Sequence, residues 1–205
     1  MVDKKYLKEK VKKAKKLSEL IEDKFKDIIF LGISGSVASN YPKKNDDIDL
    51  LIICKNNKLW WTRLKLRWWI FIKRIPHRRF KQKEKKDQFC FNLWLDEKGL
   101  LLPNGKRNLQ NGMDLMMMKV LINKDKIYEK FLLKNDWVKE FLINGYERKI
   151  KKIDKDKIRG AKDNIKINYK KNSLLNFSCF WIQYWYMNKR ITQEIVNYHQ
   201  AFFHS

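Results

Sequence analysis

The N-terminal region shows the hydrophobic period of an amphipathic helix. Between residues 4 and 24, apolar side chains recur mostly at steps of three and four among lysines: Tyr6, Leu7, Val11, Ala14, Leu17, Leu20 and Ile21. Steps of this length place side chains on one face of a helix. The apolar run within residues 27–32 then stops at a glycine, which predicts a short buried strand after the helix.

The middle of the chain predicts two further strands and one long helix. Apart from two acids near its start, the segment 47–54 is apolar, and the segment 88–95 is rich in aromatic side chains. Both segments therefore predict strands. Residues 59–75 carry apolar side chains on nearly every side, and we expect a largely buried helix there. It should end before Pro76, because the residue before a proline is restricted to extended conformations.

Beyond residue 105 the pattern is helical. The hydrophobic period predicts helices at residues 109–120 and 127–142, and one long or two shorter helices at residues 157–188. From this order we predict an α+β fold in which a small mixed sheet with flanking helices precedes a C-terminal helical bundle. We place the sheet in a first domain, residues 1–105, and the bundle in a second domain, residues 106–205.

Length and composition exclude several classes of protein. The chain has 205 residues with 44% hydrophobic content, which is enough for a core. The longest apolar run near the middle, residues 68–72, is far shorter than the roughly 20 residues of a membrane span. No apolar segment follows the basic N-terminus as in a secretory signal. We therefore expect a cytoplasmic protein with no membrane partner.

The cysteines and histidines do not predict a disulfide framework or a zinc site. The cysteines lie in separate apolar segments, at Cys54, Cys90 and Cys179. Their odd number and wide spacing favour reduced thiols in the core. The three histidines lack the paired spacing of zinc ligands. Any metal ion should therefore be held by oxygen.

The formal charge of +24 is compatible with a nucleic-acid partner. Such a charge attracts anions and makes binding weaken as salt rises. However, most of the charge is lysine spread along the whole chain, and asparagine is also abundant. The base composition of an AT-rich genome produces the same pattern, so the charge alone is a weak indication.

Residues 32–53 combine a glycine–serine turn with two acids in an apolar strand. Gly35 and Ser36 precede a loop, after which Asp47 and Asp49 begin the second predicted strand. Because successive strand side chains point to opposite faces, these two carboxylates lie on one face. They repel each other unless a cation neutralises them, and oxygen ligands suit Mg²⁺ with substrate phosphates. The segment therefore predicts a site for a metal-bound triphosphate.

The residues of the turn suit the binding of phosphate. Gly35 permits a tight turn and the close approach of a ligand to the backbone. Ser36, at the start of a short predicted helix, offers a hydroxyl and an amide to phosphate oxygens, and the helix dipole favours anions there. Ser34 is a further candidate hydroxyl for the same phosphates.

In this order of elements, the chain resembles the nucleotidyltransferase superfamily typified by DNA polymerase beta. The resemblance covers about residues 17–97 and rests on Gly35-Ser36, on Asp47 and Asp49, and on a third acid. It implies that a carboxylate at the start of a following strand completes the metal site, for which Asp87 is the best candidate and Asp96 the fallback. It also implies two Mg²⁺ ions: Asp47 and Asp49 hold the nucleotide-bound ion, and with Asp87 they hold the ion that activates an attacking hydroxyl while pyrophosphate leaves.

Aromatic and basic side chains supply candidates for binding nucleic acid. Four tryptophans stand among basic residues and could stack on bases: Trp60, Trp61, Trp68 and Trp69. Aromatic side chains at helical spacing usually fill the core, and we favour that interpretation for most of them. The basic stretch around Pro76 is the better candidate for contacting an acceptor, through Arg74, His77, Arg78 and Arg79.

We therefore expect a Mg²⁺-dependent nucleotidyltransferase with an NTP as its substrate. It would pass a nucleoside monophosphate, without a template, to an acceptor hydroxyl, and the charge favours a nucleic-acid 3′ end. One alternative keeps the chemistry but modifies a protein side chain or a small molecule, as minimal nucleotidyltransferases of toxin–antitoxin pairs and antibiotic-modifying members do. Another alternative is a basic nucleic-acid-binding module that has lost activity.

Overall fold

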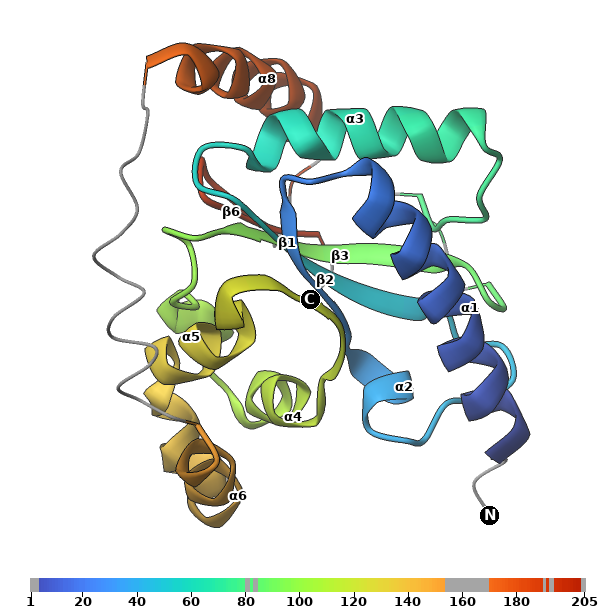
Figure 1. Ribbon diagram of the computed structural model, residues 1–205, viewed down its shortest axis with the longest axis vertical. Coiled ribbons are helices and arrows are strands. Elements are labelled where there is room, and N and C mark those ends of the chain that lie inside the picture. The colour runs from blue at the N-terminus through green and yellow to red at the C-terminus, as the bar shows by residue number, and fades with distance from the viewer. Residues whose placement is uncertain are drawn as a thin grey trace.

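Figure 1 shows a computed structural model of the protein. It describes residues 4–79, 82, 85–153, 170–189, 191 and 194–203. Within these residues, one mixed sheet lies between two layers of helices, which makes the protein an α+β fold as expected.

The sheet has six strands in the order β4-β1-β2-β3-β6-β5 in the part of the chain that is described. Their bounds are β1 Ile28–Ile33, β2 Ile48–Cys54, β3 Phe89–Asp96, β4 Lys119–Asn123, β5 Ile195–Val196 and β6 Gln200–Phe202. Strands β2 and β3 pair in parallel, and every other neighbouring pair is antiparallel. The three strands expected from the apolar runs are confirmed, and strands β1, β2 and β3 form the centre of the sheet.

The helices cover the two faces of the sheet. Three of them share one core with the first face: α1 Lys4–Lys24, α3 Leu59–Ile72 and α8 Lys170–Asn188. Three others pack on the opposite face: α4 Leu109–Met117, α5 Ile127–Lys134 and α6 Lys139–Lys151. The short helix α2, Gly35–Ala38, joins β1 to the loop before β2. Single 3₁₀ turns lie at Asn104–Lys106, Lys124–Lys126 and Asp136–Val138.

The prediction of a C-terminal helical bundle is wrong. After α4 the chain returns to the sheet as β4, which pairs with β1, and near its end β6 pairs with β3. Helix α8 lies on α3, on the other face of the sheet from α4, α5 and α6 (Figure 1). The backbone groups of β1 and β3 need partners on their outer sides, and short segments after residue 105 supply them. Part of the helix expected at residues 157–188 falls outside the described residues, and its remainder is within α8.

The helix expected at residues 59–75 forms, but it is buried along one side only. Trp60 and Trp69 lie in the core as expected, whereas Trp68 and Phe71 are 66% and 65% exposed. The three cysteines are buried and free, which confirms their prediction as reduced core thiols.

A side chain from α8 caps the start of α3. Asn176 Oδ1 accepts hydrogen bonds from the backbone N–H groups of Trp60, at 2.8 Å, and Trp61, at 3.1 Å. The first N–H groups of a helix have no partner within the helix, and Lys58 at the N-cap position provides no side-chain acceptor. Asn176 is fully buried, so a residue far along the chain satisfies these two donors.

Replacing Asn176 by alanine should destabilise the protein, because it leaves two buried N–H groups without an acceptor. We expect the free energy of unfolding to fall by about 1–3 kcal/mol, measured by denaturant unfolding. Asn188→Ala is the matched control, because it makes the same change at an exposed position of the same helix. Equal destabilisation by both variants would contradict this account of the cap.

Candidate active site

The glycine–serine turn meets the carboxylate pair because β1 and β2 are antiparallel neighbours. Their register pairs Ile33 with Leu50, and Ser34 N–H donates to the backbone oxygen of Asp49 at 3.0 Å. Gly35 has φ +64°, and a Cβ added there would lie 2.5 Å from Asp49 Oδ2. Only glycine fits this position, since a side chain would be strained and would collide with the carboxylate.

Asp47 and Asp49 form a cluster with a cysteine. The parallel register of β2 and β3 places Cys90 directly beside Asp49. One ligand atom from each of Asp47, Asp49 and Cys90 lies within 4.8 Å of the others. The structure thus brings together the two acids predicted as metal ligands, and it adds a thiol that the sequence analysis assigned to the core.

The surroundings of Asp49 change its ionisation. Burial, and then the charge of Asp47, raise the pKa of Asp49 to about 7, against a hydrogen bond from Cys90 and the charge of Arg78. Burial also raises the pKa of the Cys90 thiol, and the nearby carboxylates add to this effect. A cation bound between these groups would relieve the repulsion, which is why such clusters favour metal ions.

The basic stretch expected to bind nucleic acid contributes one side chain to this cluster. Arg78 Nη1 donates to Asp47 Oδ2 at 3.0 Å, and Arg78 Nε donates to the backbone oxygen of Gln82 at 2.9 Å. The loop is fixed to the start of β3, because Arg78 N–H donates to the oxygen of Phe89.

The other members of that basic set make different contacts. The His77 ring nitrogen Nδ1 lies 3.0 Å from the oxygen of Ile75. Arg79 N–H donates to the side chain of Gln82 at 3.1 Å, and Arg74 is an exposed residue with positive φ after the end of α3. Within the described part of the chain, Arg78 is the member of this basic set that forms an ion pair with the carboxylates.

Asp87, the best candidate for a third metal ligand, faces α1 instead. It lies 3.0 Å from the buried Lys10 Nζ and 2.7 Å from Lys13 Nζ. Burial opposes its charged form, but hydrogen bonds from Lys13 and Lys10 outweigh burial and lower the pKa of Asp87. Asp87 is not in the cluster of Asp47, Asp49 and Cys90. Its present contacts are those of an ion pair that joins the loop before β3 to α1.

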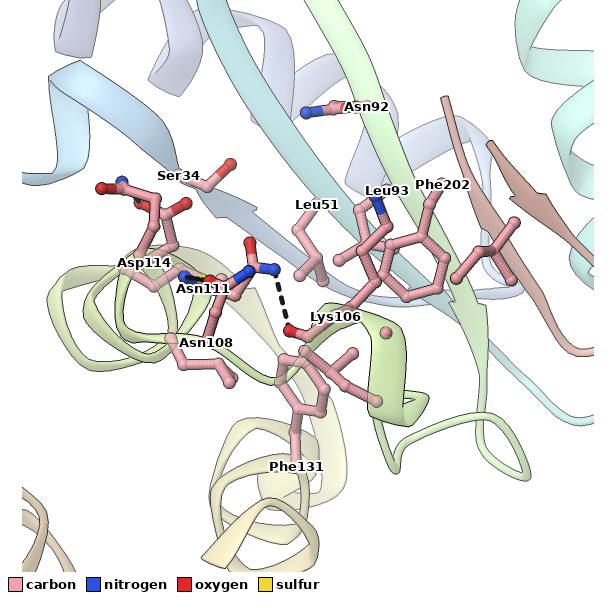
Figure 2. Close-up of a pocket in the computed structure, with 16 residues that line it drawn as sticks. Ser34, Leu51, Asn92, Leu93, Lys106, Asn108, Asn111, Asp114, Phe131 and Phe202 are labelled. Atoms are coloured by element: carbon pink, nitrogen blue, oxygen red, sulfur yellow. Dashed lines mark hydrogen bonds between the residues drawn. The ribbon is translucent and has the colours of Figure 1, made fainter. Parts of the chain in front are cut away.

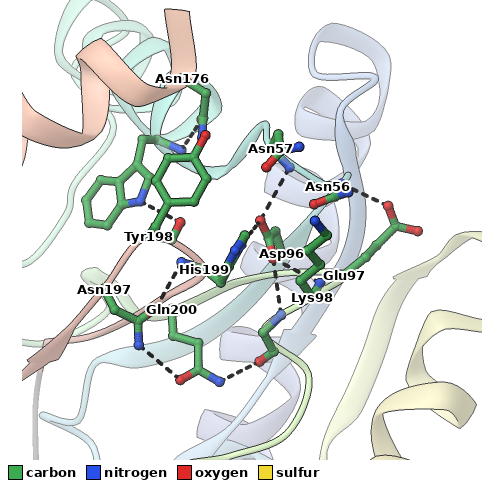
Figure 3. A network of polar contacts seen from close by, with 12 residues as sticks. Asn56, Asn57, Asp96, Glu97, Lys98, Asn176, Asn197, Tyr198, His199 and Gln200 are labelled. Carbon is green, nitrogen blue, oxygen red and sulfur yellow. Dashed lines mark hydrogen bonds and ion pairs between the residues drawn. The ribbon is translucent and has the colours of Figure 1, made fainter. Parts of the chain in front are cut away.

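The fallback candidate, Asp96, lies at the far end of β3 from Cys90 and organises a loop. Figure 3 shows its fully buried carboxylate accepting from His199 Nδ1 at 2.8 Å and from the N–H groups of Lys98 and Gly99. The N–H of Asn57 donates to the same carboxylate at 3.3 Å. The Asp96 carboxylate therefore accepts hydrogen bonds from the turns around it, and it lies away from Asp47 and Asp49.

The serines of the turn divide between two roles. Ser36 Oγ donates to Asp46 Oδ2 at 2.8 Å, and the N–H of Lys43 donates to the same oxygen. This pairing holds the loop between α2 and β2. Ser34 lines a cavity next to the turn, so its hydroxyl is the one that a ligand in the cavity could meet.

A third acid lies near Asp49 that was not predicted from the sequence. Asp114 in α4 accepts a hydrogen bond from the backbone of Gly35, and burial raises the pKa of its carboxyl. Its charge in turn contributes to the raised pKa of Asp49. The signal was a lone charged residue in a helix whose other side chains are apolar or amide, a position where a carboxylate needs a specific partner.

A cavity of about 460 Å³ opens beside the turn, between the sheet and α4 (Figure 2). Ser34 and Asp114 lie at one end, and amide, aromatic and aliphatic side chains line most of the rest, among them Asn92, Asn108, Asn111, Leu51, Phe131 and Phe202. Asn92 is the extra residue of a bulge in β3, where the register with β2 shifts, and bulges re-aim side chains. Its buried Oδ1 has no hydrogen-bond partner within the described residues. The cavity therefore offers an unused hydrogen-bond acceptor.

Comparisons with known proteins add no relative. A scan against family models, a search of curated proteins and a search of solved structures each found no match for this chain.

The raised pKa of Asp49 predicts a pH-dependent stability. The folded protein holds this proton up to about pH 7, whereas an ordinary aspartate loses it near 3.8. The folded state therefore binds more protons between these values, and its stability falls as pH rises through this window. In metal-free protein, we expect Asp49→Asn to raise the Tm by about 3–8 °C at pH 8 and by about 2 °C or less at pH 5.

Thermal unfolding followed by circular dichroism at both pH values measures this effect. Asp23→Asn is the matched control, because it removes the same charge at a position that is 93% exposed. An increase in Tm that is the same at pH 5 and pH 8 would rule out repulsion at Asp49 as its cause.

Asp87→Asn should reduce stability without reducing the affinity for divalent cations. The substitution leaves the buried Lys10 without its carboxylate, which should cost about 2–4 kcal/mol. Binding of Mn²⁺, followed by its paramagnetic resonance signal, should match that of the unsubstituted protein, whereas Asp47→Asn and Asp49→Asn should weaken it. Loss of Mn²⁺ binding in folded Asp87→Asn would instead restore Asp87 as a ligand.

Proposed function

We propose that this protein is a Mg²⁺-dependent nucleotidyltransferase that passes a nucleoside monophosphate from an NTP to an acceptor hydroxyl. The observation that carries the proposal is the contact of Gly35 with the Asp49 carboxylate, beside Asp47 and on the face of the sheet where Ser34, Leu51 and Asp114 line the cavity. A turn that only glycine can form, placed against paired acids, leaves room for a phosphate chain bound to a cation.

The donor set supports one Mg²⁺ site directly. Asp47 and Asp49 offer the hard oxygen ligands that this ion prefers, whereas the Cys90 thiol suits softer cations. The two carboxylates would hold the ion, and when bound it neutralises phosphate charge and lowers the pKa of an attacking hydroxyl. The resemblance to nucleotidyltransferases implies a second Mg²⁺ ion. Because Asp87 is paired with lysines, this second ion would take its further ligands from the nucleotide.

The residues around the pair suit the remaining parts of the reaction. The acceptor oxygen forms a new ester bond to the α-phosphorus, the bond to the β-phosphate oxygen breaks, pyrophosphate leaves, and the hydroxyl proton passes to water. Arg78, already at Asp47, is placed to contact phosphate oxygens once a cation takes over the carboxylate. The cavity would take the nucleoside, with Asn92 and Asn111 facing base edges and Phe202 offering an aromatic face.

A nucleic-acid 3′ end is our proposed acceptor. Arg78 contacts the carboxylate cluster through Asp47, and the exposed Arg79 follows it in the same loop. Basic side chains beside a catalytic pair would contact the phosphates of a strand.

An inactive nucleic-acid-binding module is the second candidate, and two observations favour it. Cys90 occupies the position beside Asp49, and Arg78 already neutralises Asp47. A site of this kind would keep the basic surface while binding Mg²⁺ too weakly for chemistry.

Incubation with Mg²⁺ and each labelled NTP, together with short RNA, short DNA and the protein itself, separates these functions. We expect stepwise extension of a nucleic acid on a gel. Asp47→Ala/Asp49→Ala should reduce it by at least about 100-fold, as the loss of charge-stabilising groups does in other enzymes. Label on the protein would move the acceptor to a side chain.

Asp87→Asn is the control for this assay and should stay active at temperatures where it is folded. Cys90→Asp should raise the activity with Mg²⁺, because it supplies a third oxygen ligand. RNA binding with no transfer by either the unsubstituted protein or Cys90→Asp would favour the inactive module.

A further inference from the structure

Helix α8 buries polar side chains and exposes apolar ones, which is the reverse of the usual arrangement in a surface helix. The side chains it buries toward α3 include Asn176 and Gln183, and Gln183 Nε2 donates to the backbone oxygen of Trp60 at 2.8 Å. Its exposed side chains are large and apolar: Leu174, Leu175, Phe177, Trp181, Ile182, Trp185 and Tyr186. A helix that places amides inward and indoles outward is suited to an apolar environment on its outer side.

Helix α3, which packs against α8, exposes apolar side chains as well. Its exposed apolar side chains recur at helical steps, at Leu64, Trp68, Phe71 and Ile72. Arg63 joins the two helices through Gln183 Oε1 and through Met187 Sδ at 3.7 Å. Figure 1 shows α8 and α3 next to each other on the outside of the molecule. We call the exposed apolar side chains of α3 and α8 the outer helical face.

The outer helical face has basic neighbours and no acidic ones in its own sequence. Residues 59–79 and 170–189 contain no aspartate or glutamate. Exposed basic side chains alternate with the apolar ones, and they include Arg67, Lys73 and Lys189. Lys189 Nζ lies 5.4 Å from the centre of the Trp185 ring. The face is therefore both apolar and positively charged.

We infer that the outer helical face binds the surface of a bilayer that contains anionic lipids. Indole and phenol rings are favoured at the level of lipid headgroups, and lysine and arginine extend toward anionic headgroups from an apolar helix face. Helices α3 and α8 would lie in the plane of the interface with their aromatic side chains inserted. No helix in the described part of the chain is long and apolar enough to cross a membrane, and binding of this kind requires no such helix. Such binding would differ from the expectation of no membrane partner, which rested on the absence of a span.

Other occupants fit the outer helical face less well. A second copy of the chain would bring two positively charged, acid-free faces together, which costs free energy. A single-stranded nucleic acid would stack on the aromatic rings, but it would leave Leu174, Ile182 and Ile72 without partners. An anionic bilayer satisfies both the charge and the aliphatic surface.

Flotation with vesicles tests this inference. The unsubstituted protein should float with vesicles of phosphatidylcholine and phosphatidylglycerol, much less with phosphatidylcholine alone, and its tryptophan emission should shift to shorter wavelength. Brominated lipids should quench that emission. Trp181→Ser/Trp185→Ser should weaken the partition by about tenfold or more. Phe141→Ser/Ile143→Ser, a matched pair of exposed apolar side chains on α6, should have no effect.

Three results would overturn the inference. One is absence of flotation with anionic vesicles. The second is flotation that salt abolishes and that Trp181→Ser/Trp185→Ser leaves unchanged, which would be adsorption by charge alone. The third is light scattering that shows a dimer lost in the same variant, which would assign the face to a second copy. Asp47→Ala/Asp49→Ala should float normally, so the result is independent of the proposed transfer activity.

Discussion

The structure holds two like charges together at the start of one strand, and much of the local architecture follows from that constraint. Asp47 and Asp49 project from the same face of β2, where burial and mutual repulsion raise the pKa of Asp49 to about 7. Antiparallel β1 brings Gly35 against one carboxylate, parallel β3 brings Cys90 beside it, and the loop before β3 supplies Arg78. Each neighbour moderates the repulsion or leaves space for a cation that would remove it. If no cation bound between the two acids, replacing one of them with an uncharged residue would make the protein more stable.

The sequence allowed the local part of this site to be predicted. Gly35, Asp47 and Asp49 lie within one strand–turn–strand unit, so strand alternation and antiparallel pairing suffice to bring them together. The third ligand depends on the parallel pairing of β2 with β3, whose register the sequence does not specify. A shift of a few residues decides whether Asp87 or Cys90 stands beside Asp49. Asp87 adopts positive φ and faces two lysines of α1, an arrangement that only the tertiary structure determines.

The same limit applies to the second half of the chain. Strand β4 is a five-residue segment after an amphipathic helix, too short for its alternation to be distinguished from the end of that helix. It forms because β1 has an unpaired edge. Helix α8 was expected in a bundle from its hydrophobicity, yet the side chains that it buries include Asn176, Cys179 and Gln183, and many of its large apolar side chains are exposed. Hydrophobicity along a sequence indicates which residues avoid water, and it does not indicate whether the chain itself covers them.

The sheet separates the two sites proposed for this protein. Helices α3 and α8 share a core with one face of the sheet, whereas the cavity is lined by Leu51, Leu115 and Phe131, which belong to the core on the opposite face. A bilayer bound at the outer helical face would therefore leave the cavity open to water and to an NTP. The carboxylate pair lies on the cavity side of β2, because Asp49 and Leu51 are two residues apart on one strand. Attachment to a surface and entry of a nucleotide would thus use opposite faces of one sheet, so neither needs to interfere with the other.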